Sequence, residues 1–592
     1  MGDGQWLHTT LLWLLLLLWP LLLMSSRSTA SIAAMCPSMC TCSDETLVST
    51  CVRKGLEIVP IQLNPAVEFI DLSNNKIVKV EYELTLYTNL RHLDFSINKI
   101  QSLGSKKFEL QSNLEFLNVS YNTINVLGKD VFKGLKSLRI LDLSHNNIEL
   151  IEHNSFKDTT DLQIIDLSHN NITSFEDPTI FKTISSLKVL NLHGNQIIDI
   201  PSALLRHLPP PCVLETLTLS DNLIEIIEDK SFPAPCLHSL KVLTLGYNVI
   251  KDIEKSAFNT LHNLIRLDLS NNNLTFIPTQ QLSKLNLISE LDLSGNTFTV
   301  VKPVAFQSLF QLKTLRLSKM PRMNWVDSRA FVDNIRLESV YIEDNPEITR
   351  IPTRIFHGNP HLSYVSLRGN SLVTLDVSHF PLDRLRFLDL SGNPLHCNCS
   401  LHWLWTLAQL ETKLGVEPST LPPSNDTNSL GNDETKPHLR ITVRNLMCAS
   451  PESLKNQLVT NIDESTVRCE TTWLTVAIIT ALVLALFGAT CVALILFGSE
   501  SRKQCWCKRK DKQANEVVDT RRLAAGLHAT SGPPPILMLM PDKHYREAIL
   551  TSYMKSETDM KLVEPWLNGG ENRENEYTVD SAPPNKPHIV YV

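Results

Sequence analysis

The chain has 592 residues, a formal net charge of −7 and a hydrophobic content of 43%. These values exclude a largely disordered chain and a polytopic membrane protein, and they argue against a general nucleic-acid binder. At about 150 residues per domain, the length alone predicts about four globular domains. The 13 cysteines cannot all pair within the chain, because their number is odd.

The N-terminus predicts a secretory signal peptide over residues 1–30. The run at 11–24 is apolar and short for a membrane span, and small residues follow it, with cleavage expected after Ala30 or Ala33. No Lys or Arg precedes this run, so a signal anchor is the alternative. Export would place the following residues in an oxidising compartment, where disulfides form.

Residues 65–395 carry the repeat L-x-x-L-x-L-x-x-N-x-L, as in LRILDLSHNNI at 138–148. Fourteen copies align on one position, at steps of 23 to 27 residues. The aligned residues are Asn75, Asn98, Asn122, Asn146, Asn170, Asn195, Asn222, Asn248, Asn272, Asn296, Met320, Asn345, Asn370 and Asn393. This pattern predicts an α/β leucine-rich repeat solenoid with a curved parallel β-sheet and a mostly irregular convex side. Because repeats add length without separate cores, the expectation of four domains no longer holds.

Each position of the repeat has a physical role. The L-x-L segment is a short strand whose leucines point inward, while the residues between them point outward onto the concave face. The buried Asn is expected to bond backbone groups at the turn. A second apolar residue, often Phe, closes the far side of each coil, and we expect these rings to be core rather than a binding box: Phe108, Phe132, Phe156, Phe181, Phe232, Phe258, Phe306, Phe331, Phe356 and Phe380.

Two cysteine clusters flank the repeats and predict caps over 31–64 and 396–470, since a solenoid needs its ends covered. The clusters are Cys36, Cys40, Cys42 and Cys51, and Cys397, Cys399, Cys448 and Cys469. Metal binding is the alternative to disulfides, and the sequence allows three pairings in each cap. Both clusters resemble the caps of extracellular leucine-rich repeat proteins, which implies the pairs Cys36–Cys42, Cys40–Cys51, Cys397–Cys448 and Cys399–Cys469.

Cys212 and Cys236 lie within the repeats, at similar places in two adjacent long coils, and each follows prolines. Neighbouring coils are about 5 Å apart, as strands are in a sheet. This spacing matches the Cα separation of a disulfide, about 4.4–6.8 Å. We therefore predict a Cys212–Cys236 bridge.

The concave face offers the candidate partner-binding residues. We find no catalytic motif and expect no enzyme activity, metal or cofactor. One outward column of the concave face contains many aspartates. They could form a site for a cation or a basic partner, but we favour the alternative that Asp at this position is a common structural solution of the repeat. The departures from it are more informative: Arg316, Tyr341, Tyr364 and Arg368 fall on this face, and Tyr and Arg are typical interface anchors. Local repacking around Met320 is the alternative explanation.

N-glycosylation sequons occur only before the apolar run at 473–497. They predict glycans at Asn118, Asn171, Asn273, Asn398 and Asn425. Asn118 belongs to the concave column. A glycan there would block that part of the face and favour binding at later repeats.

Residues 473–497 carry no charge and are long enough for a transmembrane helix. Six basic residues between 502 and 512 follow, which indicates a cytoplasmic flank. The sequence thus predicts a single-pass type I protein of the plasma membrane with an extracellular N-terminus. Alanines recur every four residues from Ala477 to Ala493, so a lateral homodimer through this helix is a hypothesis. The alternative is that alanine is simply common in membrane helices.

The tail, 498–592, has few periodic apolar segments and is predicted to be largely disordered. Cys505 and Cys507 lie beside basic residues and are candidates for palmitoylation, with reduced thiols as the alternative. The last residues, Val590, Tyr591 and Val592, suit capture by a cytoplasmic PDZ protein.

The ectodomain resembles the insect Tartan/Capricious family of leucine-rich repeat cell-surface proteins. The resemblance is carried by NWVDSRAFVDN (324–334), IPTRIFHGNP (351–360) and NPLHCNCSLHWLWTL (393–407). It implies cell–cell recognition or adhesion, in tissue boundary formation and neuronal targeting, through a protein on an opposing cell. A receptor for a soluble ligand, or an accessory subunit of another membrane receptor, is the alternative.

Overall fold

The computed structural model describes residues 36–233, 236–414, 440–441, 446–469 and 473–507. The chain divides into two compact units, Met1–Val476 and Ala477–Val592. The predicted signal peptide at 1–30 and the tail from residue 508 onward lie outside the described residues.

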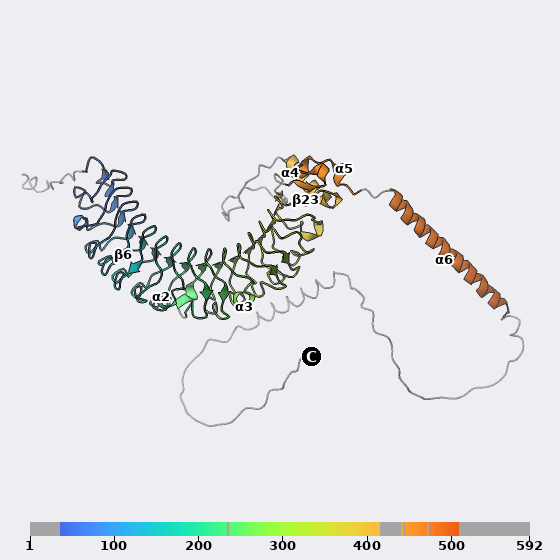
Figure 1. Ribbon diagram of the computed structural model, residues 1–592, viewed down its shortest axis with the longest axis horizontal. Coiled ribbons are helices and arrows are strands. Elements are labelled where there is room, and N and C mark those ends of the chain that lie inside the picture. The colour runs from blue at the N-terminus through green and yellow to red at the C-terminus, as the bar shows by residue number, and fades with distance from the viewer. Residues whose placement is uncertain (1–35, 234–235, 415–439, 442–445, 470–472, 508–592) are drawn as a thin grey trace, which may run out of the picture. The chain divides into compact units, whose positions relative to one another are not determined.

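The first unit is built on one sheet of 17 strands, and its coils follow an arc (Figure 1). Apart from the antiparallel pair β1–β2, each strand is parallel to the next. The strands, in the order in which they pair, are β1 (Thr41–Ser43), β2 (Val48–Thr50), β3 (Phe69–Asp71), β4 (His92–Asp94), β5 (Phe116–Asn118), β7 (Ile140–Asp142), β9 (Ile164–Asp166), β10 (Val189–Asn191), β11 (Thr216–Thr218), β13 (Val242–Thr244), β15 (Arg266–Asp268), β16 (Glu290–Asp292), β18 (Thr314–Arg316), β20 (Ser339–Tyr341), β21 (Tyr364–Ser366), β22 (Phe387–Asp389) and β24 (Arg440–Ile441).

Four further sheets are parallel pairs of very short strands. They are β6 (Val126–Leu127) with β8 (Leu150–Ile151), β12 (Ile226–Ile227) with β14 (Asp252–Ile253), β17 (Val300–Val301) with β19 (Trp325–Val326), and β23 (Leu395–His396) with β25 (Cys448–Ser450). Short helices α2 (Ser202–Arg206) and α3 (Thr279–Leu282) lie on the outer side of the arc (Figure 1). The 3₁₀ helices are η1 (Glu83–Leu86), η2 (Cys236–Ser239), η3 (Val377–His379), η4 (Cys399–Leu401), η5 (Glu452–Leu454) and η6 (Val459–Asn461).

The repeat pattern explains the sheet. In β7, the central Leu141 is fully buried while Ile140 and Asp142 are half-buried on the other face, as strand alternation requires. The backbone bonds of each strand go to the neighbouring coil, so Ile140 pairs with Phe116 on one side and Ile164 on the other. These features confirm the predicted leucine-rich repeat solenoid.

The aligned asparagines bond backbone groups at the turn, as the sequence predicts, and they also join adjacent coils. The Asn98 amide donates to the carbonyl oxygens of Leu72, one coil earlier, at 3.0 Å and of Phe95, in its own coil, at 2.9 Å. Its Oδ1 accepts from the Ile77 N–H at 3.0 Å. Since all these groups are buried, an unmet donor or acceptor there would destabilise the fold. The side-chain amide of Asn98 therefore satisfies the buried backbone groups of the turn, which water does not reach.

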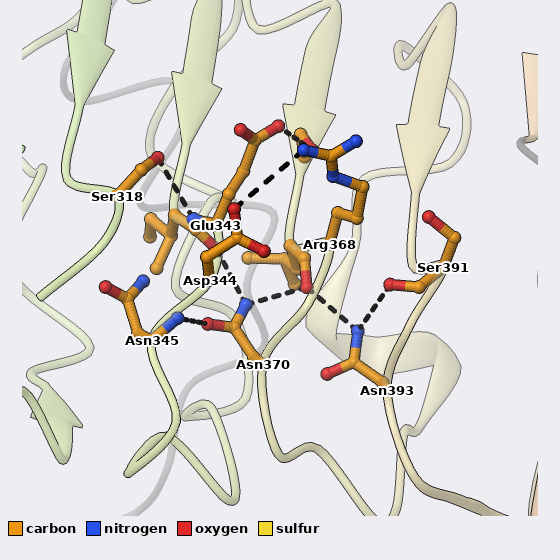
Figure 2. Close-up of polar contacts among 11 residues, drawn as sticks. Ser318, Glu343, Asp344, Asn345, Arg368, Asn370, Ser391 and Asn393 are labelled. Atoms are coloured by element: carbon orange, nitrogen blue, oxygen red, sulfur yellow. Dashed lines mark hydrogen bonds and ion pairs between the residues drawn. The ribbon is translucent and has the colours of Figure 1, made fainter. Parts of the chain in front are cut away.

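This ladder of asparagines changes register at Met320. In the regular coils the N–H two residues after each ladder residue donates to the next asparagine, but here the Met320 N–H itself donates to Asn345 Oδ1, at 2.8 Å. Asn345 repeats the exception, because its own N–H donates to Asn370 Oδ1 at 2.9 Å (Figure 2). A proline follows each of these two ladder residues, Pro321 and Pro346. Proline lacks an N–H, which removes one inter-coil donor at each turn.

The phenylalanines form a second buried row, which confirms that they are core. All ten are at most 3% exposed. Several rings of the row contact the ring of the adjacent coil, as with Phe331, whose centroid lies 5.9 Å from that of Phe306 and 6.0 Å from that of Phe356. The row continues into the C-terminal cap, where Phe380 packs near Trp403 at 5.8 Å.

Disulfides hold both caps. Cys36 is bonded to Cys42 and Cys40 to Cys51 at the N-terminal end, while Cys397 is bonded to Cys448 and Cys399 to Cys469 at the C-terminal end. These are the pairs that the resemblance to extracellular caps implies. The C-terminal cap also contains α4 (His402–Leu414) and α5 (Glu464–Val467).

Cys212 is disulfide-bonded. The Cys236 side chain lies outside the described residues, so the predicted bridge between the two remains a proposal.

The remaining helix, α6 (Trp473–Cys507), contains an uncharged stretch, Val476–Ala493, that is long and apolar enough to cross a membrane. It begins at the residue where the sequence predicts the span and continues beyond the predicted end at 497. Cys505 and Cys507 fall at its C-terminal end, but their side chains lie outside the described residues.

Candidate functional site

The aspartates of the concave column have a local structural role. Each uses Oδ1 to accept the N–H two residues ahead, as Asp71 does from Ser73 at 2.9 Å and Asp142 does from Ser144 at 2.9 Å. This bond caps the end of the strand, which is why the Asp-x-Ser pattern recurs. The geometry supports the structural interpretation of the aspartate column over a cation site.

Three of the four predicted partner-binding residues come together on β18, β20 and β21. The Arg316 guanidinium lies over the Tyr341 ring, 4.1 Å from its centroid. Tyr341 in turn contacts Tyr364, with centroids 4.9 Å apart. Phe387 on β22 extends the row, because its ring stacks on that of Tyr364 at 4.5 Å with an interplanar angle of 9°. We call these four residues the cation–aromatic row.

Arg368, the fourth predicted residue, is engaged differently. Its guanidinium forms an ion pair with Asp344, at 3.8 Å (Figure 2). The nearby Glu343 accepts a hydrogen bond from the Ser366 hydroxyl at 2.5 Å, and its backbone N–H donates to Ser318 Oγ at 3.1 Å. Arg368 therefore belongs to a polar network that borders the cation–aromatic row.

Burial in the sheet raises the pKa of both tyrosines in the row. Desolvation is the main cause for Tyr341 and for Tyr364. Arg316 partly offsets the rise at both residues, since a cation favours the phenolate. Both hydroxyls consequently stay protonated at neutral pH and can donate hydrogen bonds.

Two further aromatic rows were not predicted from the sequence. Near the N-terminal cap, His92 stacks between Phe69 and Phe116, with both centroid distances 4.1 Å. Along the turn that follows the strands, Tyr121 stacks on His145 at 4.1 Å and His145 on His169 at 4.2 Å, while His193 contacts His169 edge-on at 4.7 Å. Reading the outward position before the central leucine of each strand would have found the first row. The second row needed the turn position, three to four residues after the central residue of the strand.

The His92 stack predicts a loss of stability in acid. Burial lowers the pKa of His92, with Asp94 and Asp71 opposing this shift. The folded state thus binds the proton more weakly than the unfolded chain, whose His pKa is about 6.5. The contribution of His92 to stability is present above that pH and decreases as pH falls from about 6.5 toward the lower folded pKa. We expect the unfolding midpoint of His92→Leu to depend less on pH between about 7 and 5 than that of the parent chain, measured by denaturant titration. An unchanged pH dependence would contradict this role.

The predicted glycosylation residues differ in exposure. Asn171 and Asn273 are exposed. Asn118 is half-buried; its amide donates to Asp94 Oδ2 at 3.3 Å, and its Oδ1 accepts from the Ser120 N–H at 2.9 Å. Asn398 caps η4 by accepting from the Ser400 N–H at 3.0 Å. Asn425, like Val590, Tyr591 and Val592, lies outside the described residues.

Among the described residues, no group of three or more His, Cys, Asp or Glu side chains is arranged to hold a metal ion. The cation–aromatic row offers flat ring surface, one guanidinium and neutral hydroxyl donors. This combination suits non-covalent recognition of another molecule.

Comparison with known proteins gives the same fold class as the structure, the leucine-rich repeat solenoid. The family described as "Leucine rich repeat" matches residues 88–148, 112–172, 136–197, 212–274, 238–298, 262–320 and 335–395. The NT-3 growth factor receptor of Gallus gallus is 42% identical over 60 residues, which are 10% of this chain and 7% of that protein. The oligodendrocyte-myelin glycoprotein of Mus musculus is 36% identical over 75 residues, which are 13% of this chain and 17% of that protein. The chain thus aligns with less than a fifth of either relative.

A solved structure of a Leptospira interrogans leucine-rich repeat protein covers 58% of this chain and 89% of its own, with 25% identity and a TM-score of 0.48. The repeats that the family matches are those that form the parallel sheet. The chain is a leucine-rich repeat protein.

Proposed function

We propose that this protein is a single-pass cell-surface receptor of the plasma membrane whose leucine-rich repeats recognise a protein on an opposing cell. The cation–aromatic row carries the proposal, because Arg316, Tyr341, Tyr364 and Phe387 form a partly exposed surface of the residue types that dominate protein interfaces. Helix α6 supplies the candidate membrane span, and the two curated relatives described above are a receptor and a myelin glycoprotein.

The sequon pattern supports this part of the concave face. No sequon occurs between Asn273 and Asn398, so the predicted glycans leave the coils of the row uncovered. Asn118, by contrast, would carry its glycan on the concave column nearer the N-terminal cap.

The biological setting is proposed from the resemblance to the Tartan/Capricious family, which implies cell–cell adhesion in tissue boundaries and neuronal targeting. The second candidate is a receptor for a soluble ligand or an accessory subunit. The short match to the NT-3 growth factor receptor favours this alternative, because that protein is named as the receptor of a growth factor.

Three proposals concern the membrane and the tail. The alanine spacing in α6 suggests a lateral homodimer, Cys505 and Cys507 are candidates for palmitoylation, and the terminal Val590-Tyr591-Val592 is a candidate ligand for a PDZ domain. The palmitoylation and PDZ proposals require the C-terminal segment to lie in the cytoplasm.

Cell mixing tests the recognition proposal. Cells that display the full chain are mixed with a panel of labelled neuronal and epithelial cells, and mixed clusters are counted. We expect clusters with at least one cell type, and we expect Tyr341→Ala to reduce them by about tenfold, because truncating an interface tyrosine commonly costs more than 1 kcal/mol.

The matched control is Tyr82→Ala, since Tyr82 is 72% exposed and lies outside the row. Surface levels are equalised by antibody labelling of an extracellular tag. Clustering that survives Tyr341→Ala would exclude the row as the binding surface. A chain that clusters with no cell type but responds to conditioned medium would favour the soluble-ligand alternative.

A further inference from the structure

We infer that the cation–aromatic row recognises an acidic side chain, Asp or Glu, next to an apolar residue on a loop of the protein partner, and that Arg316 is the residue that binds this carboxylate. The inference rests on the proposed function, because it specifies the partner for the same surface.

Arg316 differs from the other strand-associated arginines in its surroundings. Arg91 is paired with Glu115 at 3.2 Å, and Arg266 is paired with Glu290 at 3.6 Å. Within the described residues Arg316 has no carboxylate at ion-pair distance, and its guanidinium rests on the Tyr341 ring instead. The guanidinium has five N–H donors, so its contact with Tyr341 leaves others available for a bidentate carboxylate.

The nearest acidic groups are already in use. Asp292 lies opposite Arg316 in the sheet register, but its Oδ1 accepts from the Ser294 N–H at 2.9 Å, and burial raises its pKa. Glu343 accepts from Ser366, and Asp344 pairs with Arg368. Arg316 opposes the rise in the pKa of Asp292, but no ion pair joins these two side chains in the described residues, so the guanidinium remains available to an external carboxylate.

A second free cation lies at the other end of the row. Arg386 directly precedes Phe387 and is exposed, and no ion pair involves it in the part of the chain that the structure describes. The row therefore presents an aromatic surface with an arginine near each end. The neutral hydroxyls of Tyr341 and Tyr364 add donors, which favours a partner with acceptor oxygens.

A protein loop fits this arrangement better than a sulfated polysaccharide does. Arg316 and Arg386 are three strands apart, and Arg386 lies three positions before Asp389, the β22 residue in register with Arg316, so the two arginines are separated by more than about 14 Å. A polyanionic chain requires a continuous basic track, whereas this surface has two separated cations with rings between them. An acidic residue beside a leucine, isoleucine or phenylalanine would pair with the guanidinium while its neighbour covers the rings.

Selection from a phage-displayed library of random peptides tests the inference. Cells that display the full chain serve as the target, after depletion on cells that lack it. We expect enriched peptides to carry Asp or Glu beside an apolar residue. Their binding should fall about tenfold on Arg316→Gln and further on Arg316→Glu, since a charge-assisted bidentate contact is lost and then replaced by repulsion. The matched control Arg266→Gln should change binding by less than about twofold, because Arg266 is already paired with Glu290.

Each other outcome overturns the inference in a distinct way. Peptides that depend on Tyr341 but lack acidic residues, or that tolerate Arg316→Gln, would leave the recognition surface in place and remove the carboxylate partner. Binding of sulfated dextran that depends on Arg316 would replace the protein loop with a polyanion. A library that yields no peptide above the depletion control, together with failed cell mixing, would reject the proposed function as well.

Discussion

Phe331→Ala is expected to lower the free energy of unfolding by about 3–5 kcal/mol, because it empties one position of a continuous buried row. The ring is fully buried and contacts Phe306 and Phe356, one in each neighbouring coil. A repeat array has no distant contacts that could close such a cavity, so both adjacent coils lose packing. Denaturant-dependent proteolysis of the solubilised full chain measures the effect.

Phe310→Ala is the matched control, since this ring is 53% exposed. We expect the free energy of unfolding of this variant to stay within about 0.5 kcal/mol of that of the parent chain. Equal effects of the two substitutions would show that the buried row is not what stabilises these coils.

Asn146→Ala is expected to lower the free energy of unfolding by about 1–3 kcal/mol, because it leaves a buried backbone donor without its partner. The Asn146 amide donates to the carbonyl oxygens of Val119 at 3.0 Å and Leu143 at 3.1 Å, and each of these oxygens also accepts from a second asparagine. The Ile124 N–H, in contrast, donates to Asn146 Oδ1 at 3.0 Å. Loss of that acceptor is therefore the main expected cost.

The adjacent Asn147 provides the control for this substitution. It is exposed, so Asn147→Ala should change the free energy of unfolding by less than about 0.5 kcal/mol in the same assay. If the two alanine variants unfolded alike, the asparagine ladder would be a feature of the sequence without a comparable role in stability.

Most of the fold could be predicted because the repeat states the same rule fourteen times. The strands, the inward leucines, the asparagine ladder and the phenylalanine row all follow from one alternating pattern. The register change at Met320 and Asn345 could not be predicted in the same way. It depends on which N–H reaches the next asparagine once Pro321 or Pro346 follows, and that is a property of two coils together.

Buried amides on the far side of the coils also escaped prediction. Asn334 donates to the Phe306 and Leu309 carbonyl oxygens, at 3.0 and 3.1 Å, and Asn359 makes the equivalent bonds one coil later. In the sequence they look like ordinary polar residues of a turn. Only the packed neighbour shows that each one is a partner for backbone groups.

The candidate site was predictable in part. Arg316, Tyr341 and Tyr364 could be named because outward positions of a strand can be counted from its central leucine. Phe387 was missed, since it resembles any apolar residue of the repeat. The pairing of Arg368 with Asp344 depends on side-chain direction across neighbouring coils, which no count along one coil supplies.

The change of register at Met320 has a consequence for how the array responds to force. Coils coupled only to their neighbours act as springs in series, so bending concentrates at the junction that is most easily deformed. Pro321 and Pro346 each remove an inter-coil donor, and Arg316 and Tyr341 lie on the strands that enter these two turns. The cation–aromatic row is thus carried by junctions that each lack one inter-coil donor. We expect bending of the array to concentrate there, and the curvature of the row to adjust to a partner before that of the regular coils on the N-terminal side.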